Sequence, residues 1–402
     1  MAEEKLVPKL RFRGFGDEWN EFKLGEIGSF KNGVNKSKDD FGHGFPFINL
    51  EDIFNKDVLK KDEYGLVNVS NKELKEYDLK KGDVLFVRSS VKPEGVGLTT
   101  VVSEDLVDTV YSGFIIRFRE EKQFIHDDFK KYCFKIRPFR NSLMSMSTTS
   151  ANTNINQDSL NKLKIKVPTL NEQKKIGSFL NLIDIKLDLL HNKHKSYVNF
   201  KKYLMQQIFA QKLRFDENES SWNIMKIESL ISEYKEKAGN NNFPVLSSTL
   251  SGIYLQSDYF DKNVNSEDTK DYKIVPKGYF TYRSMSDTGV FRFNIQNIVE
   301  KGIISPAYPV FTTTDINDIF LEQYLNNSSF IKRQILTLKE GGTRYALGLN
   351  KFKKLKIEVP SINEQNKIAA CFETIDNKIN NVYAELNFVN DFKKGLLQQM
   401  FI

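Results

Sequence analysis

The sequence predicts a mixed α/β (α+β) fold, in which two α/β domains are joined by two long antiparallel helices as a pseudo-twofold tandem duplication. Three observations predict it. A Pro-x-x-x-Glu-Gln-x-x-Ile motif occurs twice, a heptad pattern follows each copy, and a short leader containing the chain's two tryptophans precedes each domain. An internal repeat of this kind determines the architecture of the whole chain.

The repeated motif marks the start of each long helix. Its copies lie at 168–176 and 360–368, 192 residues apart. Thr169 and Ser361 are suitable N-caps, and in both copies a glutamate follows three residues later, which is the spacing of a capping box. We therefore expect helices over 169–211 and 361–402.

Apolar residues then recur with an alternating spacing of three and four, which predicts a coiled coil rather than a globular helix. A helix of about 40 residues would be about 60 Å long. We expect the two helices to pair with each other. One position of the heptad is apolar throughout each helix. In the first helix it is occupied by Ile176, Ile183, Leu190, Tyr197 and Leu204, and in the second by Ile368, Ile375, Val382, Val389 and Leu396.

The leaders define the remaining boundaries. Lys9-Leu10-Arg11-Phe12 with Trp19 returns as Lys212-Leu213-Arg214-Phe215 with Trp222, 203 residues later. The predicted domains are therefore 1–168 and 212–360, each with its own leader. Both contain short β-like segments between turn residues; the strongest are 45–48, 84–87, 111–116, 243–246 and 279–282, with helices expected at 125–136 and 315–338. The domains resemble each other less than the helices do, which predicts one scaffold with two different binding surfaces.

Composition favours a binding protein of a reducing compartment, so we expect a cytoplasmic location. The net charge of +7 is compatible with a polyanionic partner. Cys133 and Cys371 have no metal or redox spacing. The polar N-terminus lacks the pattern of a signal peptide, and no apolar run approaches the 18 residues of a membrane span.

The sequence offers no catalytic motif. It contains no Gly-x-x-x-x-Gly-Lys loop and no pair of adjacent prolines, so the Asn/Asp-Pro-Pro-aromatic motif of amino-methyltransferases is absent. His191 and His194 share a helix face but no third ligand is spaced for zinc. We predict no catalytic residue, no metal site and no cofactor in this chain.

These features resemble the specificity (S) subunits of type I restriction–modification systems over essentially the full length. The resemblance rests on the duplicated motif, the helix after each copy, the tryptophan leaders, and Gly-Asp-x-Leu-Phe-x-Arg-Ser at 82–89. It implies a non-catalytic subunit with two target recognition domains. Each domain would recognise half of a split site in double-stranded DNA, and the helices would set the gap.

The resemblance also implies partners. Two methylation (M) subunits would dock on the helices, and restriction (R) subunits would join them. The assembled complex would be an adenine-N6 DNA methyltransferase and ATP-dependent endonuclease, with S-adenosylmethionine, ATP and Mg bound by the partner subunits.

Candidate DNA-binding residues are arginines and hydroxyls at strand ends, since Arg pairs with guanine and Ser or Thr bonds bases or phosphates. A surface ion pair remains an equal interpretation for the two arginines that follow strands, and a plain polar linker for the Thr/Asn segment. The segment 81–90 lines up with 277–286, which is one residue shorter before its arginine, so the sequence matches Arg88 with Arg283. In the first domain the candidates are Arg88, Ser89, Ser90, Lys92, Thr148, Thr149 and Asn152; in the second they are Arg283, Ser284, Ser286, Arg344 and Tyr345, the last two after Gly341-Gly342.

The apolar helix ends are candidates for partner docking. They are Leu204 and Phe209, with Leu396 and Phe401 in the second copy. The alternative is that they pack against the adjacent domain. The sequence is also compatible with two other functions: a scaffold whose domains bind proteins or glycans, and a self-sufficient enzyme.

Overall fold

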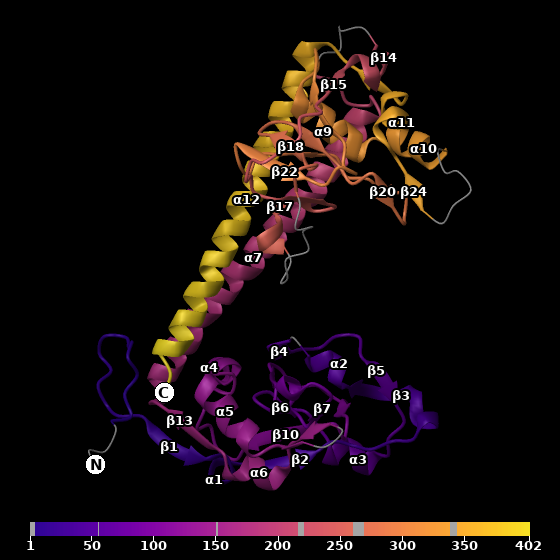
Figure 1. Ribbon diagram of the computed structural model, residues 1–402. Helices are drawn as coiled ribbons and strands as arrows, with labels where there is room; N and C mark the ends of the chain where they lie inside the picture. Colours follow the sequence, from indigo (N-terminus) through magenta and orange to yellow (C-terminus); the bar gives the residue numbers. More distant parts are fainter. Residues whose placement is uncertain (1–4, 55, 150–151, 216–220, 260–268, 338–343) are drawn as a thin grey trace. The chain divides into compact units, whose positions relative to one another are not determined.

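The computed structural model describes residues 5–402 except 55, 150–151, 216–220, 260–268 and 338–343. The chain forms two compact units, residues Met1–His191 with Ala384–Ile402, and residues Asn192–Tyr383. Each unit holds one predicted domain and part of both long helices, α7 (Leu170–Phe209) and α12 (Ile362–Gln399) (Figure 1). The helices are thus divided between the units instead of forming a unit of their own.

The strands described in the first unit form several sheets, and the largest of these is a central sheet of five strands. Besides parts of α7 and α12, its elements are β1 (Asn20–Lys23), α1 (Leu24–Ile27), β2 (Gly28–Asn32), η1 (Lys38–Asp40), β3 (Phe41–Ile48), α2 (Leu50–Ile53), β4 (Val58–Leu59), β5 (Gly65–Val67), α3 (Asn71–Glu76), β6 (Val84–Val87), β7 (Ser89–Ser90), η2 (Pro93–Gly95), β8 (Thr99–Val102), β9 (Val110–Tyr111), β10 (Ile115–Glu120), α4 (Asp127–Cys133), α5 (Arg137–Ser145), β11 (Thr148–Thr149), β12 (Thr153–Asn154), α6 (Gln157–Lys162) and β13 (Lys164–Val167).

The second unit has a similar succession of elements with a smaller sheet. These are β14 (Asn223–Lys226), η3 (Ile227–Ser229), β15 (Ile231–Glu233), β16 (Leu246–Thr249), β17 (Gly252–Leu255), α8 (Gln256–Tyr259), β18 (Lys273–Pro276), β19 (Phe280–Thr281), β20 (Met285–Ser286), β21 (Asn294–Ile295), β22 (Lys301–Ile304), β23 (Val310–Thr313), α9 (Asp318–Asn327), α10 (Ser329–Thr337), β24 (Tyr345–Ala346), α11 (Leu349–Lys353) and β25 (Lys356–Val359).

The central sheets of the two units have the same strand order. Over the four strands that correspond, it is β2-β10-β6-β8 in the first and β15-β23-β19-β21 in the second, and β4 adds a fifth strand beside β8 in the first. All four residues of β6 are buried, as their apolar run predicts. The predicted strand 111–116 is divided, because a turn at 113–114 separates β9 from β10. The predicted helix 315–338 is likewise two helices, separated where Ser328 adopts extended backbone angles.

Within each unit α7 and α12 run antiparallel, as the heptads predict. In the first unit Asp184 forms an ion pair with Lys393, and Lys186 with Glu385. In the second, Lys201 binds Asp376 at 2.6 Å. The Asp184 and Asp376 pairs are equivalent under the repeat, and the apolar seam residues between the helices, such as Ile183 and Ile375, are buried.

The glutamate of the repeated motif holds the leader of its unit. The Arg11 guanidinium donates two hydrogen bonds of 2.7 Å to Glu172, and Arg214 donates two of 2.7 Å to Glu364. Both carboxylates are fully buried. Only part of the capping-box prediction is visible: the Ser361 hydroxyl accepts from the Glu364 backbone N–H. The glutamate is needed for tertiary structure, since a bidentate Arg–carboxylate pair is strong and directional.

The adjacent glutamine connects the helix start to the next domain helix. The side chain of Gln173 accepts from the His126 N–H before α4 and donates to the Pro168 carbonyl. Gln365 makes the equivalent bonds to Asn317 before α9 and to Pro360. Glu-Gln therefore recurs because it joins a leader, a long helix and a domain helix in each unit.

Each leader also bonds to the end of a long helix. The Leu213 N–H donates to the Gln207 carbonyl in the second unit, where leader and helix are continuous in sequence. In the first unit the Leu10 N–H donates to the equivalent Gln399 carbonyl, although these residues lie at opposite ends of the sequence. The two units therefore repeat the same junction with different connectivity.

Candidate nucleic-acid interface

In the first unit the predicted DNA-binding residues come together on a small three-stranded sheet. Its order is β11-β12-β7, with Ser90 opposite Thr153 and Thr149 opposite Thr153 on the other side. Thr148 and Thr149 are exposed on one edge strand, and Ser89 and Ser90 are half-buried on the other. Lys92 and Asn152 are exposed beside this sheet. The structure thus joins two segments that the sequence offered as separate candidates.

In the second unit the equivalent segments also pair. β20 and β24 are antiparallel, with Ser286 opposite Tyr345. The Arg344 guanidinium binds the Asp287 carboxylate at 2.8 Å, and both side chains are largely exposed. Such a surface pair contributes little to stability and leaves Arg344 accessible. Gly341 and Gly342, which precede it, lie outside the described residues.

The structure corrects the correspondence of the two domains. The Ile155 N–H donates to the Arg88 carbonyl, and the Leu347 N–H donates to the Ser284 carbonyl. Arg88 is therefore equivalent to Ser284, one residue away from the match with Arg283 that the sequence suggests. Their side chains have similar contacts: Arg88 donates to the Gly113 carbonyl at 3.2 Å and Ser284 to the Ala307 carbonyl at 2.9 Å.

These contacts divide the predicted arginines into two kinds. Arg88 is half-buried and fixes the strand end against a turn, and among the described residues no carboxylate pairs with it. Arg283 is exposed and lines a cavity of about 580 Å³ together with Ser286. Further hydroxyls, a second arginine and one carboxylate complete its polar lining: Ser247, Ser248, Thr249, Ser251, Thr288, Tyr308, Arg292 and Asp287.

Two further arginines beside these surfaces were missed by sequence reasoning. Arg140 on α5 donates to the Glu94 carbonyl in η2, which follows β7, and its buried Nη1 has no partner among the described residues. Burial lowers the pKa of its guanidinium. Arg292 lines the second unit's cavity, and its buried Nε likewise lacks a described partner. No local motif marks either arginine, because only the fold brings Arg140 to a loop 46 residues away.

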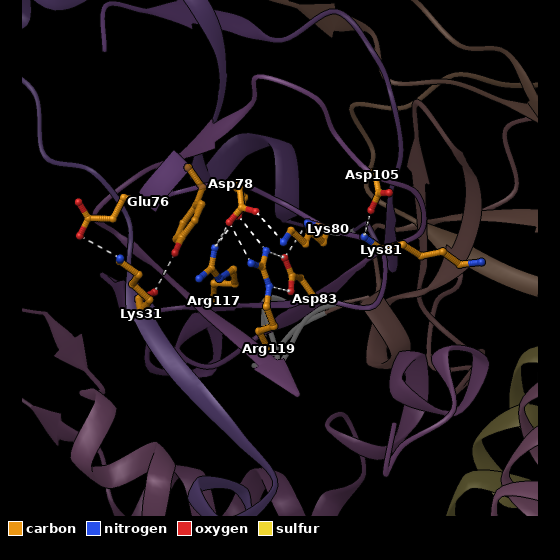
Figure 2. A network of polar contacts seen from close by, with 10 residues as sticks. Lys31, Glu76, Asp78, Lys80, Lys81, Asp83, Asp105, Arg117 and Arg119 are labelled. Atoms are coloured by element: carbon orange, nitrogen blue, oxygen red, sulfur yellow. Dashed lines mark hydrogen bonds and ion pairs between the residues drawn. The ribbon is translucent and has the colours of Figure 1, made fainter. Parts of the chain in front are cut away.

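Other basic residues of the first unit belong to a structural network at the opposite end of β6 (Figure 2). Arg119 donates to the buried Asp83 at 2.7 and 2.6 Å and also binds Asp78, which accepts from Arg117 as well. Burial opposes ionisation of Asp78, but the bonds from Arg119 outweigh it and lower its pKa. These two arginines hold the sheet together and are not candidates for DNA contacts.

The predicted docking residues pack inside the units. Phe209 lies against Tyr324 at 5.3 Å between ring centroids, and Phe401 lies against Phe129 at 5.1 Å. Leu396 is buried, and Leu204 packs against the core of the second unit. These residues attach the helix ends to the adjacent domains, which is the alternative interpretation of their apolar character.

The fold thus defines a duplicated protein with two unlike polar surfaces, one per unit. A family model described as the type I restriction modification DNA specificity domain matches residues 16–198 and 221–388. The chain therefore belongs to the family of type I restriction–modification specificity subunits, which carry DNA-recognition domains and are non-catalytic.

Individual relatives agree. The chain is 21% identical to the type I restriction enzyme MjaX specificity subunit of Methanocaldococcus jannaschii, over 98% of this chain and 95% of that protein. It is 22% identical to the MjaIX specificity subunit of the same organism over 64% of this chain and 63% of that one.

Solved structures share the fold. The S subunit of a type I system from M. genitalium has a TM-score of 0.58 at 14% identity, covering 98% of this chain and 99% of that one. The HsdS subunit from Thermoanaerobacter tengcongensis has a TM-score of 0.51 at 14% identity, covering 100% and 98%. Within the described residues, no helix is long and apolar enough to cross a membrane, and no group of three His, Cys, Asp or Glu side chains could hold a metal ion.

Proposed function

We propose that each unit recognises one half of a split DNA site and that α7 and α12 set the gap between the halves. The observation that carries this proposal is the pairing of β7 with β12 and of β20 with β24. Equivalent strand ends carry different side chains in the two units. Direct readout depends on which side chains face the base edges, so two different surfaces read two different half-sites.

The chemistry of each surface fits this role. Ser, Thr and Asn in the first unit can bond bases or phosphates, and Lys92 can neutralise a phosphate. Arg283 and Arg344 in the second unit can each form the bidentate contact that distinguishes guanine. Tyr345 lies beside them and can contact phosphate.

Partner subunits supply the chemistry. Two methylation subunits dock on the helices and restriction subunits join them in the cytoplasm. Those subunits bind S-adenosylmethionine, ATP and Mg, and the assembly methylates adenine at N6 and cuts DNA.

The test is reconstitution. The chain is mixed with the methylation subunit of its own system, S-adenosylmethionine and a randomised DNA library, and methylated sites are sequenced. We expect a two-part target methylated only when both proteins are present, with binding that weakens steeply with salt. Methylation by the chain alone, or an uninterrupted target, would contradict the proposal.

A further inference from the structure

The helix pair has an apolar face in the first unit. We define it by five side chains that are between 47% and 72% exposed: Leu182, Ile185, Leu189, Phe388 and Phe392. Isolated exposed apolar residues are normal, but a contiguous group marks an interaction site. These five side chains form such a group only if they share one side of the helix pair.

Helix spacing and one ion pair show that they do. Leu182 and Leu189 lie four residues before and three residues after Lys186, so they flank it on α7. Phe388 lies three residues after Glu385 on α12, and Phe392 lies four residues further. Lys186 binds Glu385 at 2.9 Å. That contact joins the two stripes, and Ile185 lies between the two leucines on the α7 stripe.

The equivalent face in the second unit is polar. Under the 192-residue repeat, the three aliphatic residues correspond to Thr374, Asn377 and Asn381, and Phe388 corresponds to Ser196. All of these residues are exposed. Of the five apolar side chains only Phe392 has an apolar counterpart, Phe200, which is 50% exposed.

The charges at the centre of the two faces differ as well. Where the first unit has the Lys186–Glu385 ion pair, the second has Lys378 and Lys193 at the equivalent positions. A helix that covers the first face meets charges already neutralised by each other. A helix that covers the second face meets two lysines, whose desolvation is costly without an added carboxylate.

The extent of the apolar face indicates the kind of partner. Its five side chains present on the order of 500 Å² of apolar surface. Two copies of this chain that met through this face alone would fall short of the roughly 800 Å² that each partner buries in a stable interface. A helix of a larger subunit can lie along both stripes and extend its contacts over the polar flanks.

We propose that the apolar face is the tight docking site for an amphipathic helix of one methylation subunit, and that the polar face of the second unit binds the second methylation subunit more weakly. The two docking steps are unequal, and a complex with a single methylation subunit, held at the first unit, accumulates before the full complex. This inference rests on the proposed function, which requires only that two such subunits dock.

The experiment titrates the full chain with the methylation subunit and follows complex mass by analytical ultracentrifugation. We expect two binding steps whose dissociation constants differ at least tenfold. In the intermediate, hydrogen exchange should slow at 182–189 and 385–392 but not at 374–381.

Two matched variants exchange the faces. Leu189→Asn with Phe388→Ser gives the first unit the residues of the second, and should weaken the tight step at least tenfold. Asn381→Leu with Ser196→Phe does the reverse and should strengthen the weak step. All four positions are exposed, so thermal unfolding should be unchanged.

Three results would overturn this inference and leave the proposed function intact. They are equal dissociation constants for the two binding steps of the original chain, slowed hydrogen exchange at 374–381 in the intermediate, and an unaltered tight binding step in the Leu189→Asn/Phe388→Ser variant. Self-association of the chain that this variant abolishes would assign the face to a second copy instead. Failure of the methylation subunit to bind at all would overturn the inference and the proposed function together.

Discussion

The two units use the same framework to present different surfaces. Both hold their leader with a bidentate arginine–glutamate pair, and their sheets share one strand order. At the end of the equivalent strand, however, the first unit has a hydroxyl-rich sheet, whereas the second has an exposed arginine over a cavity. The buried contacts that fix each domain are thus separate from the side chains of the candidate interfaces, so one set can vary without the other.

The largest effect should come from changing helix length. A heptad inserted after His191 and another after Tyr383 preserve the seam and add about 10 Å to each helix. At 3.4 Å per base pair, the gap of the target should lengthen by about three base pairs while both half-sites stay the same. Methylated targets can be sequenced to check this. The control is a heptad inserted in α7 alone, since it shifts the seam of α7 out of register with that of α12. An unchanged gap in the double insertion would refute the proposal that the helices set the gap.

Next in size is the loss of a leader contact. Arg214→Ala leaves the buried Glu364 carboxylate without its ion partner, which should destabilise the second unit by about 3 kcal/mol. Arg11→Ala is the matched variant and should do the same to the first unit. Thermal unfolding with hydrogen exchange locates each effect. Loss of protection in the wrong unit, or in neither, would show that the pair does not hold the leader.

A smaller effect is expected from the arginines at the candidate interface. Arg283→Ala should relax discrimination at one base pair of one half-site by about 1–3 kcal/mol, without loss of stability. Arg88→Ala should affect only the other half-site, and should also cost about 1 kcal/mol of stability through its bond to Gly113. Binding to a library of sites measures both. Lys277→Ala, at an exposed ion pair with Glu300, is the control.

The smallest effect expected is on the stability of the folded chain at acidic pH. Burial opposes ionisation of Glu364, but the bonds from Arg214 and from the Phe215 N–H outweigh it, so its pKa is lowered from 4.5. A lowered pKa in the folded state contributes stability above pH 4.5, and that contribution is lost as pH falls through the folded value. Denaturant unfolding from pH 7 to 3 should show this loss. Glu364→Gln should remove that part of the slope, and an identical slope would contradict the assignment.

The sequence predicted the fold where the signal was periodic or repeated. The heptads of 169–211 and 361–402 gave the antiparallel helices, and the run at 84–87 gave a central strand. It could not show that Glu172 and Glu364 bind arginines of the leaders, because a capping box has the same spacing. It also missed the pairing of Ser90 with Thr153, since short polar strands have no pattern of their own.

For the candidate surfaces the sequence found residue types but not their surroundings. Arg88 and Arg283 look equivalent in sequence, yet one is fixed to a backbone carbonyl and the other is exposed. Phe209 and Phe401 look like docking residues because they are apolar at helix ends, but they are buried in the domain cores. Burial and register depend on contacts between distant segments, which composition does not record.

The central claim is that two unlike recognition domains on a duplicated helix pair read two unlike half-sites. It is tested most directly by replacing residues 212–360 with a second copy of residues 9–168, so that both domains are the first one. Sequencing of methylated DNA from cells that contain this chain and its partner subunits should then reveal an inverted repeat of one original half-site, with the original gap. An unchanged asymmetric target would contradict the account.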